Sequence, residues 1–265
     1  MLCGLVDALC DDKLLLNNIS RSNIGDAGGR ALGAALQAMP APLSFTEISL
    51  FSCALSAVGI APIAQACRRG FAAPGLQRLD LRDNVHLGDD GLAILARALP
   101  LTLESFAMGS TGCGDLGLVA MARALGTMTH LKSLYCGMNP AIGAVGCDAL
   151  AAALPRMTAL SSLNSSGLHM GDAGMAALAS RLPEAPALTK LCLCYNSIGD
   201  VGAKDLCKVL PRCLKLADGD REVHDFARGL DLGENQYSAA SALALDAAGG
   251  TRIQIIHHYT DSDDD

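Results

Sequence analysis

One pattern of apolar positions recurs along the chain. Its clearest copy reads L-x-x-L-x-L-x-x-N followed by a G-D-x-G turn, and it comprises Leu188, Leu191, Leu193, Asn196, Gly199, Asp200 and Gly202. The equivalents of Leu191 are Asn17, Ile48, Leu79, Phe106, Leu134, Leu163, Leu230 and Ile253. Most of these positions lie 27–31 residues apart, so one repeated unit accounts for nearly the whole chain.

Each copy joins a strand pattern to a helix pattern. The L-x-x-L-x-L half alternates apolar and other residues, which predicts a short strand with one buried face. Beyond the last glycine the apolar residues take helical spacing, as at Leu95, Ala96 and Leu99. We expect the turn aspartates to cap the helices of their own repeats; these are Asp26, Asp89, Asp115, Asp172 and Asp200. Several helices should end near a proline, at Pro100, Pro155, Pro183 and Pro211.

The frame resembles the leucine-rich-repeat family, specifically its long, helix-containing ribonuclease-inhibitor-like class, over roughly residues 14–255. The resemblance implies an α/β solenoid, a curved horseshoe with a parallel β-sheet on the concave face and α-helices on the convex face. It also implies a ladder of buried asparagines at Asn84, Asn139, Asn196 and Asn235. Leu168 stands at the same position and cannot hydrogen-bond, so that rung is expected to be missing.

We predict a single domain over residues 1–265. Residues 1–13 form a partial N-terminal repeat helix, 14–250 the repeats, 251–257 a closing strand and 258–265 an acidic tail. The interval before Leu230 is 39 residues, and its excess lies in a charged insertion at about 213–226. The first repeat is degenerate, so the chain is expected to be a monomer or part of a longer array.

Composition narrows the function classes. The net charge of −7 disfavours partners such as nucleic acid or an anionic membrane, and no apolar run is long enough for a membrane span. Eleven cysteines, an odd number in a chain large enough to fold without cross-links, indicate free thiols in the cytosol or the nucleus. Only 3% of residues are aromatic, which favours small regular contacts between repeats.

Two short motifs in the sequence resemble cofactor or metal sites. Gly112, Gly114 and Gly117 match a dinucleotide fingerprint, but the last two are the turn glycines of the repeat itself. Cys192-x-Cys194 has no second pair at a structural-zinc spacing, so we predict no metal site. The sequence has no nucleophile elbow and no phosphate-binding loop. We therefore predict a protein that is not an enzyme and needs no cofactor.

The outward-facing strand residues are the predicted binding site. In the middle strands they are small and nearly uncharged, and charges gather toward the two ends. We predict that a protein partner docks on this concave face, with contact residues Tyr135, Asn164, Cys192, Cys194 and Tyr195. Charged residues at its rim would orient the partner; these are Arg78, Asp80, Arg82 and Asp231.

Two alternatives belong to other classes. Ran GTPase-activating proteins have similar repeats and an acidic C-terminal region, although the acidic run here is only Asp261–Asp265 and no catalytic residue of that family matches this chain. A ribonuclease-inhibitor-like blocker of a basic enzyme would need an acidic concave face, and this face is mixed.

Overall fold

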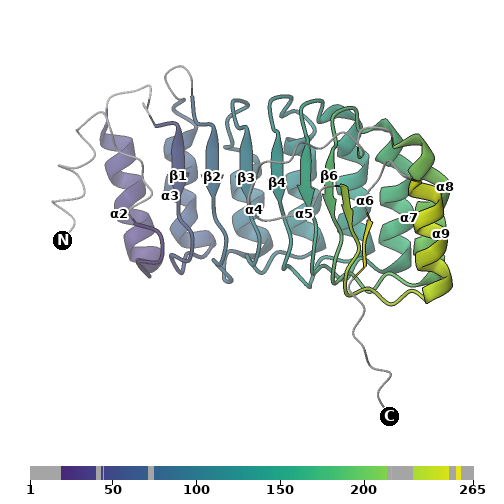
Figure 1. The fold of residues 1–265 in the computed structure, drawn as a ribbon. Coiled ribbons are helices and arrows are strands. Elements are labelled where there is room, and N and C mark those ends of the chain that lie inside the picture. The colour runs from purple at the N-terminus through teal and green to yellow at the C-terminus, as the bar shows by residue number, and fades with distance from the viewer. Residues whose placement is uncertain are drawn as a thin grey trace, which may run out of the picture.

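The repeats build two layers, a parallel sheet and a row of helices behind it, in the computed structural model (Figure 1). The structure describes residues 19–39, 43, 45–70, 75–213, 216, 229–250 and 255–257. The strands are β1 (Glu47–Ser49), β2 (Arg78–Asp80), β3 (Ser105–Ala107), β4 (Ser133–Tyr135), β5 (Ser162–Asn164), β6 (Lys190–Cys192), β7 (Gly229–Asp231) and β8 (Ile255–Ile256). The helices are α2 (Gly25–Ala38), α3 (Ala57–Cys67), α4 (Gly88–Ala96), α5 (Asp115–Leu125), α6 (Ala144–Ala153), α7 (Gly171–Arg181), α8 (Asp200–Val209) and α9 (Ala239–Gly249).

Strands follow one another in chain order, all parallel, so each repeat lies beside its neighbours in sequence. The central residues of β1 to β7 pair in register and are at most 5% exposed; they are Ile48, Leu79, Phe106, Leu134, Leu163, Leu191 and Leu230. This confirms the predicted alternation and the α/β solenoid. The helices α6, α7 and α8 end just before Pro155, Pro183 and Pro211, as predicted, and a single-turn 3-10 helix containing the proline follows each of them. The helix α4 ends at Ala96, before Pro100.

One anchor was misplaced. The residue that pairs with Leu230 in the closing strand is Ile255, not Ile253. The predicted N-terminal helix, all of the insertion at 213–226 except Cys213 and Leu216, and the acidic tail lie outside the described residues.

The asparagine ladder is present, and each rung bonds to the preceding repeat. Asn139 is fully buried, and its Oδ1 accepts the N–H groups of Thr111 and Cys113 at 2.9 and 3.2 Å. Its Nδ2 donates to the carbonyls of Met108 and Cys136 at 3.0 and 2.9 Å. Similar bridges are made by Asn84, Asn196 and Asn235. One side chain thus satisfies backbone groups that neither repeat could satisfy alone.

Other residues at the rung position behave differently. Cys53 donates its thiol to the carbonyl of Ile19, 3.1 Å away in the preceding repeat. Thr111 can donate its hydroxyl to the Met108 carbonyl of its own repeat at 2.9 Å or to Asn139 Oδ1 of the following repeat at 3.3 Å. Leu168 is fully buried and has no polar side-chain atom, so the predicted missing rung is confirmed.

The turn aspartates cap a different helix from the predicted one. Asp89 lies in the first turn of α4, but its Oδ1 accepts the N–H groups of Gly114 and Gly117 at 2.7 and 2.9 Å, at the start of α5. Asp26, Asp115, Asp172 and Asp200 likewise bond to the start of the next helix. The prediction of capping within a repeat was wrong, because a residue already inside the first turn presents its side chain to the neighbour and not to its own N-terminal N–H groups.

The start of each helix depends on the repeat before it. Ala57 and Ala144 stand where the other repeats have aspartate. The helices that follow them, α4 and α7, begin at Gly88 and Gly171 with φ of +61° and +57°, conformations that favour glycine. Each of these two glycines donates its N–H to a carbonyl of the following repeat at 2.9 Å. Where the preceding repeat has no carboxylate, the helix therefore begins with a glycine of positive φ whose N–H is bonded to the following repeat.

Asp89→Ala should destabilise the protein by about 1–2 kcal/mol, because two N–H groups at the start of α5 lose their acceptor. Asp90→Ala is the matched control, since Asp90 is the next residue of α4, is exposed and has the same charge. Its effect should stay within about 0.5 kcal/mol. Urea unfolding at neutral pH measures both, and equal losses would refute the inter-repeat cap.

Candidate functional site

The open face of the sheet, opposite the helices, is the predicted concave binding face, and we call it the sheet face. A depression of about 330 Å³ lies on it and extends from β1 to β6. Small side chains from three adjacent strands form much of its floor, namely Ser105, Ala107, Ser133 and Ser162. Charged and aromatic residues around them are Glu47, Arg78, Asp80, Arg82, Tyr135 and Lys190.

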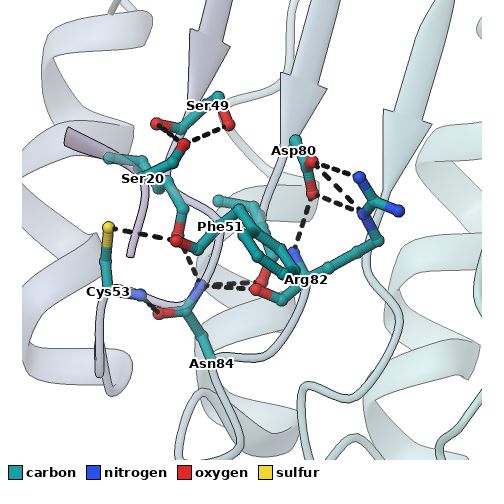
Figure 2. A network of polar contacts seen from close by, with 9 residues as sticks. Ser20, Ser49, Phe51, Cys53, Asp80, Arg82 and Asn84 are labelled. Carbon is teal, nitrogen blue, oxygen red and sulfur yellow. Dashed lines mark hydrogen bonds and ion pairs between the residues drawn. The ribbon is translucent and has the colours of Figure 1, made fainter. Parts of the chain in front are cut away.

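Arg82 is held in place from several sides. Its guanidinium bonds to both carboxylate oxygens of Asp80 at 2.8–3.2 Å, and Figure 2 shows the side chain turned back onto that carboxylate. The guanidinium carbon also lies 5.4 Å from the ring centre of Phe51 and 5.7 Å from that of Tyr135. The hydrogen bond to Asp80 raises the pKa of Arg82. The cation is therefore fixed between two aromatic rings before any partner arrives.

The other charges on this half of the face are paired across strands. Arg78 contacts Glu47 at 2.8 Å, and Lys132 contacts Glu104 at the same distance. The hydrogen bond from Lys132 lowers the pKa of Glu104. These pairs are largely exposed, so each contributes little to stability. The ion pairs do balance the charge of this half of the face, so that positive and negative groups alternate and neither sign dominates.

Tyr135 rests on Gly109, which lies in the turn two residues after β3. A Cβ added to Gly109 would lie 1.9 Å from Tyr135 Cε1, so only glycine leaves room for the ring. Burial raises the pKa of the Tyr135 hydroxyl. Gly109 and Phe51 also stand at positions where the strand pattern predicts outward-facing residues, but their role depends on which side chains lie beside them.

Asn164 does not lie on the surface as predicted. It is only 4% exposed, since its Oδ1 accepts the N–H and hydroxyl of Ser166 and its side chain packs against Gly137 of the preceding repeat. Among the described residues, Asn164 Nδ2 is a buried donor without an acceptor. Cys192, another predicted contact, is 3% exposed. The alternation of positions along a strand could not predict that the side chains of Asn164 and Cys192 are buried on this face of the sheet.

Cys192, Cys194 and Asp231 do come together. The two sulfurs are 3.3 Å apart, and Cys192 Sγ lies 3.6 Å from Asp231 Oδ2 on the adjacent strand. The thiol contact raises the pKa of Cys192 and lowers that of Cys194. Tyr195, the remaining predicted contact, is 58% exposed in the turn after β6, with φ of +56°, and does not line the depression.

Comparisons with known proteins agree with the repeat. Residues 75–96 match a family model described as Leucine Rich repeat. No curated protein matches the chain. No described helix has the length and apolar character needed to cross a membrane.

Leiomodin-1 actin-binding site 2 and the yeast Rad7–Elc1 complex are among the solved structures with a similar fold. Leiomodin-1 actin-binding site 2 is 17% identical and covers 60% of this chain and 86% of its own, with a TM-score of 0.46. The yeast Rad7–Elc1 complex is 13% identical and covers 96% of this chain and 76% of its own, with a TM-score of 0.31. At these scores neither structure bears on what this chain binds.

Cys194 should be alkylated faster than Cys207 in the folded, reduced protein with chelator present. Both thiols are half-buried, but the contact with Cys192 lowers the pKa of Cys194, whereas burial raises that of Cys207. Peptide mass spectrometry after brief iodoacetamide treatment reports each site. Cys192→Ala should slow the modification of Cys194, and an unchanged rate in this variant would contradict the assignment.

Proposed function

We propose that this leucine-rich-repeat solenoid is a non-catalytic scaffold that docks a protein partner on its sheet face, in the cytosol or the nucleus. We place it in the ribonuclease-inhibitor-like class, because its repeats are long and each strand from β1 to β7 is followed along the chain by an α-helix, from α3 to α9. Nine cysteines of the described part are free thiols, which supports a reducing compartment.

The arrangement of Arg82 between Phe51 and Tyr135 carries the proposal. Arginine and tyrosine are over-represented among residues that dominate binding energy in protein interfaces. Here the arginine has already lost much of its freedom to Asp80 and the two rings, so less entropy remains to be lost on binding.

The floor of the depression, beside Arg82 and Tyr135, leaves room for a protein segment to lie close to the sheet. Ser133 and Ser162 pair directly in adjacent strands and project no bulky side chain into the depression. A partner segment can therefore approach the sheet closely while contacting Tyr135 at its side. The depression is open and mixed in charge, which suits a polar protein surface better than a small apolar ligand.

No observation favours the two alternatives. The cation partners of Glu47, Asp80 and Glu104 leave no acidic surface on β1 to β3 for a basic enzyme. A GTPase-regulating role stays a prediction from the repeat type alone.

The double variant Ser133→Arg/Ser162→Arg should weaken partner binding by about tenfold or more, because two arginines would fill the contact floor and cost at least ~1.4 kcal/mol. The partner is first isolated from reduced extract with wild-type protein, then purified. Its dissociation constant is measured by calorimetry against each variant.

Ala152→Arg/Ser180→Arg is the matched control. These exposed residues lie on α6 and α7, the helices that follow β4 and β5, so the same charge is added to the same two repeats. The control should bind like wild type, and both variants should keep a wild-type melting temperature. Equal affinity of the sheet-face variant and the control would contradict the proposal.

A further inference from the structure

Three potential metal ligands gather at one end of the sheet face. Cys192 and Cys194 are two residues apart and project to the same side, while Asp231 pairs with Cys192 across β6 and β7. Their sulfur and oxygen atoms all lie within 4.8 Å of one another. Two soft thiolates and a carboxylate form a donor set that zinc accepts.

The distances suit a tetrahedral ion. Zinc bonds to sulfur and oxygen at about 2.3 and 2.0 Å, so tetrahedral angles require about 3.8 Å between two sulfurs and about 3.5 Å between sulfur and oxygen. Cys192 Sγ and Asp231 Oδ2 are 3.6 Å apart, already at the required separation. The two sulfurs are 3.3 Å apart and would need to separate by about half an ångström.

The surroundings orient the donors. Asp231 Oδ1 accepts the N–H of Gly233 at 3.0 Å, which leaves Oδ2 for the cysteines. Held carboxylates of this kind are typical around bound metals.

A separate observation shows that, in the part of the chain that the structure describes, an acceptor is missing beside the cysteines. Asn164 pairs with Cys192 across β5 and β6, is 4% exposed, and keeps a buried Nδ2 with no acceptor among the described residues. Asn164, Cys192 and Asp231 line one small cavity of about 10 Å³, room for roughly one water molecule or ion. Lys190 also lines this cavity, and Cys194 does not. A thiolate formed by metal binding would place a strong acceptor in that cavity beside the amide.

We propose that Cys192, Cys194 and Asp231 form a binding site for a thiophilic divalent cation of the zinc class. Three protein ligands leave one coordination position, which water fills. The site stands on its own geometry and does not depend on the proposed docking of a protein partner.

Cobalt is the probe, because thiolate ligands give Co²⁺ an intense charge-transfer absorption. The full-length chain, reduced and freed of metal, is titrated with Co²⁺, and Zn²⁺ is then added to displace it. Wild type should bind one equivalent with this absorption, lose the absorption on addition of zinc, and melt at a higher temperature with zinc than without it. Absence of the charge-transfer absorption would overturn the proposal.

Two pairs of variants locate the site. Cys192→Ser/Cys194→Ser should abolish the absorption and the zinc-dependent rise in melting temperature, whereas Cys207→Ser should retain both. Asp231→Asn keeps an acceptor for Gly233 and removes the charge, so zinc affinity should fall by about tenfold or more.

Asp80→Asn is the control for the carboxylate. Asp80 holds the equivalent position in β2 and also accepts an N–H two residues on, from Arg82. It should bind zinc like wild type. The proposal fails if the absorption survives the double cysteine variant, or if Asp231→Asn and Asp80→Asn bind zinc equally well.

Discussion

Each repeat depends on polar groups supplied by the next or the previous one. The carboxylate of Asp89 accepts N–H groups at the start of the following helix. The side-chain amide of Asn139 bonds to Met108 and Thr111 of the preceding repeat. The two links run in opposite directions along the chain. Because buried N–H and carbonyl groups must be paired, a single repeat could not satisfy its own backbone, and neighbours must stack.

This coupling also shapes the sheet face. In-register stacking places residues of equal rank side by side, as it does Asp231 and Cys192. Tyr135 pairs with Ala107, and its ring extends over Gly109, two residues further along the preceding repeat. The face therefore differs along its length. Toward β1 and β2 it carries a fixed arginine between aromatic rings, in the middle a floor of serines, and toward β7 a cluster of sulfur and carboxylate. A regular scaffold thus presents chemically distinct regions.

The sequence was sufficient for most strands and helices, because these follow from spacing within one repeat, and the resemblance to leucine-rich repeats implied the asparagine ladder. The sequence pattern was insufficient wherever a residue interacts with a residue of another repeat. The residue capped by Asp89 and the burial of Asn164 beside Gly137 both depend on the neighbouring copy. Asp231 lies 39 residues from Cys192, across the long interval before β7, so no motif could have joined them. Phe51 stands at an outward-facing position of the repeat pattern, but the pattern could not predict its contact with Arg82.

The junction between the repeat of β4 and α6 and that of β5 and α7 lacks both polar links. Ala144 supplies no carboxylate, and Leu168 supplies no amide. Of the junctions from β1 to β7, this one depends most on apolar packing and on the hydrogen bonds of the sheet. We therefore expect it to be the seam, the junction at which the repeats on either side first unfold independently of one another. Ser133 and Ser162 lie on opposite sides of that seam, in the floor of the depression. A ligand that contacts both Ser133 and Ser162 would couple the repeats on the two sides of this junction, so that they unfold as one cooperative unit.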